Sequence, residues 1–155
     1  MLSIIIDTTD AEDRLAGLLA ALTPAAVDGV VKEVLVVDTS SSEVVAAEVD
    51  ALCEDMGATL AGDLSDAIEQ AKSDWLLVLP ADIRFRNGWL EELNDHLAGG
   101  GREAILVGDA KGGLLAGLGP KPAGVLVSKA AAMGLNDPDL QGLRRKVGAR
   151  AARLG

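Results

Sequence analysis

The sequence contains a single cysteine, Cys53, so no intrachain disulfide can form. A long apolar run is missing at its start, because Leu2–Ile6 ends at Asp7 and is far too short for a membrane span or a signal segment. These two absences indicate a cytoplasmic protein. Cys53 is expected to be a small buried side chain rather than a metal ligand or a nucleophile.

Positive charge is also scarce. The chain has 14 Lys and Arg residues against 24 Asp and Glu residues, which gives a net charge of −10. Such a surface repels phosphate backbones, so nucleic acid is not expected as a partner. The C-terminal segment is the exception, because it has no acid after Asp139 and carries Arg144, Arg145, Lys146, Arg150 and Arg153. A helix with cations near its C-terminal end is the simplest interpretation.

Aromatic residues are few, namely Trp75, Phe85 and Trp89, and tyrosine is absent. Apolar residues nevertheless make up 49% of the chain, which excludes an intrinsically disordered protein. A chain of 155 residues with this content suits one domain, residues 1–155, built around one core.

Two apolar patterns alternate along the chain. Short continuous apolar runs predict buried strands. These runs are Leu2–Asp7, Glu33–Asp38, Thr59–Leu60, Trp75–Leu79, Ala104–Gly108 and Val125–Val127. Other segments carry apolar residues every three or four positions, which predicts helices. Their stripes begin at Leu15, Val45, Leu64, Trp89 and Leu140; a further helix is expected from about Lys129, and the last helix from near Asp137.

The first two helices carry recognisable boundary signals. Thr9 and Glu12 have the spacing of a capping box at the start of the first helix, and Pro24 is expected to follow its end. The second helix is expected to begin after the serines at 40–42 and to stop at Gly57.

The alternation of continuous apolar strands with helices predicts a mostly parallel sheet with helices on both faces. Ligands of such sheets bind beyond the carboxyl ends of the strands. Four acids follow the predicted strands at this edge: Asp7, Asp38, Asp82 and Asp109. Aspartate is also a common turn and cap residue, so a ligand-binding role and a purely local role both stay open for these acids.

Three segments then stand out: SIIIDTTDAEDRLAGLLAAL (3–22), EVLVVDTSSSE (33–43) and SDWLLVLPADIRFRNGWLEEL (73–93). In order and spacing they resemble the N-terminal half of family 2 glycosyltransferases with a GT-A fold, and above all a short bacterial subgroup. The segment PAGVLVSKAAAMGLNDPDLQGLRRKVGARAARL (122–154) resembles the last portion of that family. The resemblance implies a Rossmann-like α/β domain of the GT-A type.

The resemblance also implies an enzyme that transfers a sugar from a nucleotide-diphosphate sugar to an acceptor. Asp7 and Thr8 after the first strand and Asp38 after the second would contact the donor. Asp82 matches the acid that holds a divalent metal, Mn²⁺ or Mg²⁺, on the diphosphate. Asp137 falls where the family supplies the general base for the acceptor hydroxyl.

Several positions depart from the pattern of the family. Pro80 stands where the family has a second metal-binding side chain, and Asn136 replaces a glutamate. The segment after Asp38 lacks glycines, and the acceptor region near 100–122, which ends in a Gly-rich loop, is much shorter. A second interpretation therefore stays open: a catalytically inactive member of the same fold that acts in binding or assembly. Such a module could self-associate as a homodimer through exposed apolar surface.

Overall fold

The computed structural model describes residues 1–109, 121–148 and 151–154. Its strands are β1 (Leu2–Asp7), β2 (Val31–Val37), β3 (Thr59–Ala61), β4 (Trp75–Pro80), β5 (Ala104–Gly108), β6 (Lys121–Ser128) and β7 (Ala152–Leu154). Its helices are the 3₁₀ helix η1 (Glu12–Arg14), α1 (Leu15–Val27), α2 (Glu43–Met56), α3 (Leu64–Gln70), α4 (Trp89–Ala98), α5 (Lys129–Met133) and α6 (Leu140–Val147). All six predicted strands are therefore present.

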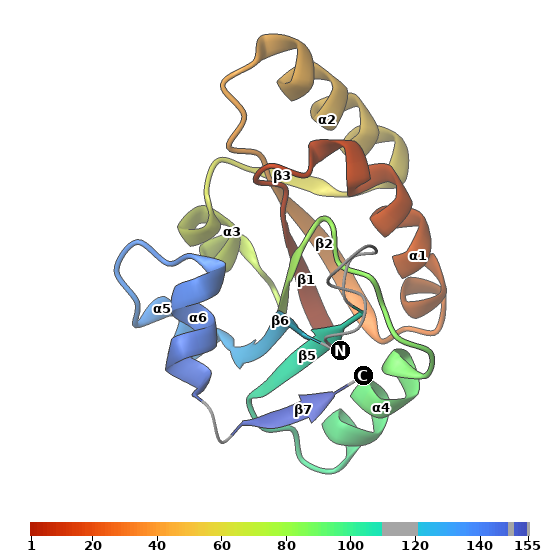
Figure 1. Cartoon of the computed structure of the whole chain (residues 1–155), viewed down its shortest axis with the longest axis vertical. Coiled ribbons are helices and arrows are strands. Elements are labelled where there is room, and N and C mark those ends of the chain that lie inside the picture. Colours follow the sequence, from red (N-terminus) through yellow and green to blue (C-terminus); the bar gives the residue numbers. More distant parts are fainter. Residues whose placement is uncertain (110–120, 149–150, 155) are drawn as a thin grey trace.

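The strands form one sheet in the order β3-β2-β1-β4-β6-β5-β7 (Figure 1). Neighbouring strands are parallel except in the two pairs that include β6. The predicted mostly parallel α/β fold is confirmed, with β6 as the antiparallel exception. Because β5 runs in the same direction as β1, the strands β1, β2, β4 and β5 all end at one side of the sheet, called here the carboxyl edge.

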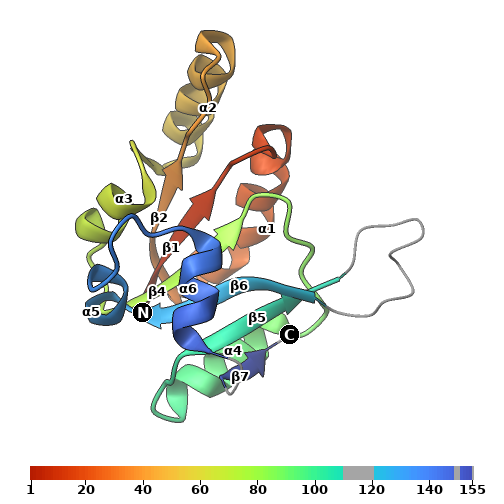
Figure 2. The same ribbon diagram turned by 60° about the vertical axis from the view of Figure 1, so that its left-hand side comes forward.

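Helices cover both faces of the sheet (Figures 1 and 2), and alternate residues of β1 pack into two different helical layers. Ile4 and Ile6 of β1 pack with α1, α2 and α4, whereas Ile5 packs with α3, α5 and α6. All three side chains are fully buried, and each such side chain stabilises the fold by about 1.5–3 kcal/mol. Burial on both faces explains why the central strands are continuously apolar rather than alternating.

Two predictions for the first helix are wrong. Thr9 does not cap it, because the Thr9 hydroxyl instead donates to Asp7 Oδ1 at 2.6 Å, and η1 begins without a side-chain cap. Pro24 does not follow the helix but lies inside α1, which continues to Val27. Pro24 lacks an N–H donor, yet its carbonyl still accepts from the amide of Asp28 at 2.9 Å, so the last turn closes normally.

Both predicted boundaries of the second helix are confirmed. The Ser42 hydroxyl accepts from the amide of Val45 at 3.4 Å and caps the start of α2. Gly57 adopts a left-handed conformation with φ of 72° and ends the helix.

The C-terminal part differs more from the prediction. Strand β6 is longer than the predicted Val125–Val127, and α6 begins at Leu140 with Asp139 as its capping residue, rather than near Asp137. Strand β7 was not predicted; it pairs in parallel with β5. Across the described ranges, no helix combines the length and the apolar character needed to cross a membrane.

Cys53 is buried in the core, as predicted, and its thiol should react slowly. Burial raises the pKa of the Cys53 thiol, and the negative charges of Asp50 and Asp38 raise it further. We expect an aromatic disulfide reagent at pH 7.5 to label the native protein at least about 100-fold more slowly than the protein unfolded in guanidinium chloride. Equal rates in the two states would show that the packing of α2 against the core does not shield the Cys53 thiol.

Candidate functional site

The carboxyl edge brings together three of the predicted acids. Asp7 is the last residue of β1 and lies opposite Val37 of β2 on one side and Pro80 of β4 on the other. Asp38 and Asp82 follow those two strands, so they flank Asp7. Asp38 and Asp82 are separated by two strand spacings, so their backbones lie about 10 Å apart.

Asp7 and Asp38 also shape the turns that carry them. Oδ1 of Asp7 accepts from both the amide and the hydroxyl of Thr9, at 3.0 and 2.6 Å. Oδ1 of Asp38 accepts from the amide of Ser40 at 2.9 Å. Each carboxylate therefore has a local role through one oxygen. The hydroxyls of Thr9 and Thr39 lie 3.1 Å apart and connect the two turns.

Thr8 is a framework residue at this edge. Its side chain is fully buried, and its hydroxyl donates to the carbonyl of Val37 at 2.7 Å. The amide of Thr8 points to the same carbonyl at 3.3 Å. Thr8 thus fixes the end of β1 against β2.

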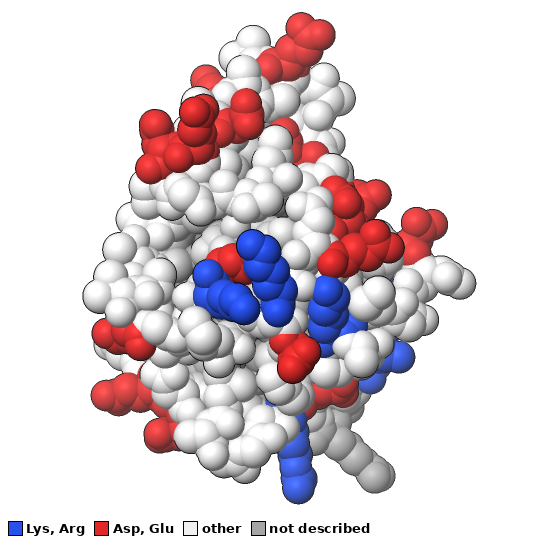
Figure 3. Space-filling model, turned by 180° about the vertical axis from the view of Figure 1, so that it is seen from behind, with Lys and Arg blue, Asp and Glu red and all other residues white. Residues whose placement is uncertain are grey.

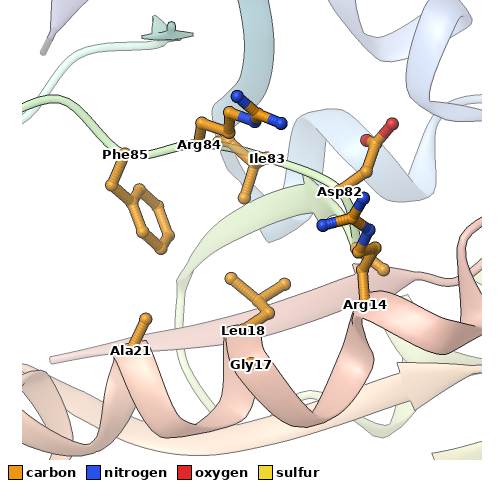
Figure 4. A pocket seen from close by; sticks show the side chains of 9 residues that line it. Arg14, Gly17, Leu18, Ala21, Asp82, Ile83, Arg84 and Phe85 are labelled. Atoms are coloured by element: carbon orange, nitrogen blue, oxygen red, sulfur yellow. The ribbon is translucent and has the colours of Figure 1, made fainter. Parts of the chain in front are cut away.

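A cleft opens beside Asp82, between α1 and the segment that follows β4 (Figure 4). Its volume is about 410 Å³. One wall is α1, where Gly17 and Ala21 leave room because their side chains are small; Phe85 lies in the opposite wall and stacks on Trp89 with ring centroids 4.0 Å apart. Arg14 and Arg84 also line the cleft, and the Arg14 side chain extends toward the segment that carries Asp82.

Arg144 of α6 approaches the same acid from the other face of the sheet. One of its terminal nitrogens, Nη2, donates to the carbonyl of Ala123 at 2.5 Å. Its Nε is buried and has no hydrogen-bond partner among the residues that the structure describes. Burial lowers the pKa of the Arg144 guanidinium, while the negative charge of Asp82 acts in the opposite direction and raises it. The cation of α6 and the acid after β4 therefore interact at the carboxyl edge.

The sequence did contain a signal for this position of Arg144. Leu140, Leu143 and Val147 form the apolar stripe of α6, and Arg144 has the spacing of the same stripe. An arginine on the buried face of a helix is held close to the sheet, unlike Arg145 and Lys146, which are exposed. This spacing was not used in the prediction, so the approach of Arg144 to Asp82 was missed.

The fourth acid, Asp109, is also at the carboxyl edge but is engaged in an ion pair. Its Oδ1 lies 3.4 Å from Nε of Arg86, and its amide donates to the carbonyl of Arg84 at 2.9 Å. Asp109 thereby holds the segment after β4 against the end of β5.

Asp137 lies in the connection between α5 and α6. It is exposed and has a φ of 45°, a left-handed conformation that is uncommon for a residue other than glycine. Its neighbours Leu135 and Pro138 face a small hollow beside Ser65 and Ile68 of α3. Asp137 therefore belongs to the α3 side of the molecule, and its role as a base stays a prediction.

The donor set for a metal ion at this edge is small. Asp82 supplies a carboxylate, whereas Pro80 has no side-chain donor. Among the described residues, no three His, Cys, Asp or Glu side chains are grouped so that they could hold a metal ion. A divalent ion at Asp82 would therefore need further oxygen ligands from a bound molecule. The Gly-rich loop Lys111–Pro122 lies almost wholly outside the described residues.

Three comparisons with known proteins place the chain in context. Residues 3–111 match the family described as Glycosyl transferase family 2. Fifteen chains of solved structures match, among them the glucosyl-3-phosphoglycerate synthase of Mycobacterium tuberculosis, crystallised with Mn²⁺, uridine diphosphate and glucosyl-3-phosphoglycerate. That likeness has a TM-score of 0.60 and 16% sequence identity, and it covers 85% of this chain and 58% of the synthase. No curated protein matches the chain.

Proposed function

The chain belongs to glycosyl transferase family 2, and from this membership we propose that it binds a nucleotide-diphosphate sugar at the carboxyl edge and transfers the sugar to an acceptor hydroxyl. The observation that carries the proposal is the position of Asp38 and Asp82 on either side of Asp7, beside a cleft lined by arginines. The mycobacterial synthase shares the fold and is 16% identical to this chain in sequence. It was crystallised with uridine diphosphate and Mn²⁺.

Different residues of the carboxyl edge would contact the nucleoside and the diphosphate of the donor. Asp38 accepts hydrogen bonds through carboxylate oxygens, which suits the hydroxyl and N–H groups of a nucleoside, and Asp7 and Thr8 shape the neighbouring turn. Arg14 extends toward Asp82 and complements the negative charge of the diphosphate. The donor would thus lie along the ends of β2, β1 and β4.

Asp82 is the residue that would hold a divalent metal. A single carboxylate suits Mg²⁺ or Mn²⁺ when diphosphate oxygens complete the ligand set, because such ions often use few protein ligands. When bound, the ion neutralises negative charge on the leaving diphosphate. The positive charge of Arg144 interacts with Asp82 and partly offsets its negative charge, so we expect the ion to bind only together with the nucleotide.

The proposed reaction exchanges one bond for another. The acceptor hydroxyl oxygen forms a bond to the anomeric carbon of the sugar, and the bond from that carbon to the diphosphate oxygen breaks. The electron pair of the broken bond stays with the nucleotide diphosphate. The hydroxyl proton passes to a base, for which the family resemblance nominates Asp137.

Two observations favour the inactive alternative. Pro80 removes a metal-binding side chain, and the remaining donor, Asp82, lies beside a cation. Val27 and Met56 also expose apolar surface, with exposed fractions of 79% and 44%. A non-catalytic module with these features would bind no nucleotide and would self-associate through that surface.

Nucleotide binding separates the two possibilities. With Mn²⁺ present and uridine diphosphate at about 100 times its dissociation constant, we expect the melting temperature to rise by about 5–10 °C, since a ligand of the native state stabilises it by mass action. Scanning calorimetry with and without Mn²⁺ measures this shift.

Matched variants make the result specific. The Asp38→Asn variant should bind the nucleotide about tenfold more weakly, which would reduce the shift by about half. The Asp28→Asn variant removes the same charge from an exposed residue at the other end of α1 and should shift like the unmodified protein. A melting temperature that does not respond to uridine diphosphate and Mn²⁺ would favour the inactive module.

A further inference from the structure

Another hollow lies between α6 and the edge of the sheet, away from the donor side. This α6 groove has a volume of about 680 Å³. It is lined by Ile105, Pro122, Gln141, Arg144, Arg145 and Arg153, which come from β5, β6, α6 and β7. Its size falls within the range of small-molecule sites, and three of its residues are arginines.

The charge of the α6 groove contrasts with that of the molecule. The chain carries a net charge of −10. On the face seen in Figure 3, acidic side chains lie mainly along the margins, around a smaller group of Lys and Arg side chains. No acid follows Asp139 in the sequence, so α6 and β7 contribute only positive charge. Arg145 and Arg153 form no ion pair with any residue that the structure describes. Their charges are therefore available to an anion from solution.

The chemistry of the α6 groove suits a phosphate group. Guanidinium groups bind phosphate oxygens through pairs of parallel hydrogen bonds, and the Gln141 amide adds further donors. A polyanion such as nucleic acid is disfavoured, because the net charge of the chain, −10, repels its other phosphates. A small phosphorylated molecule has a single phosphate group, so all of its negative charge would lie within the α6 groove.

The position of the α6 groove relative to Asp82 suggests what it does. In the sheet order, β4 stands between β1 and β2 on one side and β6, β5 and β7 on the other. The donor acids Asp7 and Asp38 follow β1 and β2, whereas the groove lies over β5 and β7. Arg144 belongs to both places, because it lines the groove and interacts with Asp82.

We propose that the α6 groove binds the phosphate group of a small phosphorylated acceptor, and that this contact presents an acceptor hydroxyl to the sugar donor beside Asp82. The proposal rests on the proposed glycosyltransferase function and names the class of its acceptor. Arg145 and Arg153 supply the anchoring charge at the outer part of the groove, and Arg144 supplies the charge at its junction with the Asp82 edge.

Titration calorimetry on the whole chain tests this assignment with glycerol 3-phosphate as the probe, and with inorganic phosphate and glycerol as comparisons. We expect glycerol 3-phosphate to bind, inorganic phosphate to bind more weakly, and glycerol not to bind. Saturation with uridine diphosphate and Mn²⁺ should leave the affinity for glycerol 3-phosphate unchanged, because the two ligands occupy different sides of Asp82.

Charge-matched variants identify the groove as the site. The double variant R145Q/R153Q should weaken glycerol 3-phosphate binding by about tenfold or more, and both residues are exposed, so the fold should persist. The control K146Q removes one charge from the next position of the same helix, outside the groove, and should change the affinity less than about twofold. Uridine diphosphate should bind all variants equally.

Other outcomes would overturn the proposal in distinguishable ways. A loss of affinity in K146Q as large as in the double variant would mean diffuse charge attraction rather than a site. Equal affinity for inorganic phosphate and glycerol 3-phosphate would mean recognition of the anion alone. Failure of glycerol 3-phosphate to bind, with uridine diphosphate bound, would reject the acceptor class and keep the proposed function. Binding of glycerol 3-phosphate without any binding of uridine diphosphate would reject both.

Discussion

The Gly124→Val variant is expected to lose about 3 kcal/mol of unfolding free energy, which corresponds to a fall of roughly 6–12 °C in melting temperature. Gly124 lies in β6, between β4 and β5. A Cβ at this position would lie 2.5 Å from Cδ2 of Leu79, 3.2 Å from the carbonyl oxygen of Val78 and 3.3 Å from Cβ of Leu106. These neighbours are buried core residues, so they cannot move aside without disturbing the packing of two strands.

The matched control for this variant is Gly17→Ala. Gly17 lies in α1, and a Cβ there would meet no atom within 4 Å. Alanine is favoured over glycine inside a helix, so this variant should gain about 0.5–1 kcal/mol. Chemical denaturation of both variants measures the two changes. A Gly124→Val protein as stable as the unmodified one would mean that β6 does not pack between β4 and β5 as described.

The second large effect concerns Asp82. If the proposed transfer takes place, the Asp82→Asn variant should release uridine diphosphate from a uridine-diphosphate sugar at least about 100-fold more slowly in the presence of Mn²⁺. The substitution keeps the size of the side chain but removes the negative charge that a metal needs. Uridine diphosphate-glucose, with water as the acceptor, is a suitable probe because the assay then needs no natural acceptor.

Two comparisons keep this result interpretable. The Asp28→Asn variant should release uridine diphosphate at the rate of the unmodified protein, because Asp28 lies outside the carboxyl edge. Calorimetric melting of the Asp82→Asn variant should show an intact fold, since Asp82 is partly exposed rather than part of the core. Unchanged release by the Asp82→Asn variant would remove Asp82 from the proposed mechanism.

Much of the fold could be predicted because buried strands and helices have recognisable patterns of apolar residues in the sequence. Strands β1 and β4 are covered by helices on both faces, so their sequences are uninterrupted apolar runs. Parallel pairing of β1 with β2 and β4 then fixes the common edge of Asp7, Asp38 and Asp82. For these residues, a local pattern and one rule about parallel sheets were sufficient.

The remaining parts depend on contacts that no local pattern encodes. An apolar run does not reveal its direction, so the antiparallel pairing of β6 could not be read from Val125–Val127. Strand β7 is short and only Leu154 in it is buried, so its structure comes from pairing with β5 rather than from its own sequence. The approach of Arg144 to Asp82 likewise joins residues that are far apart in the chain.

The same limit applies to the α6 groove. The basic residues of the C-terminal segment were visible in the sequence, but their arrangement was not. Arg145 lies on α6 and Arg153 on β7, and only the return of the chain to the edge of β5 brings them to one groove. The number of charged residues could identify the basic C-terminal segment. The class of ligand proposed for the α6 groove could be inferred only from the folded structure.

The reversed direction of β6 has a consequence for protein engineering. Since β5 ends and β6 begins at the same edge as Asp82, the connection between Asp109 and Lys121 starts and finishes there, and Gly108 pairs with Lys121 at its base. Residues inserted into or removed from this connection would leave the ladder between the two strands in register. Its length and composition can therefore be varied while the scaffold keeps its stability.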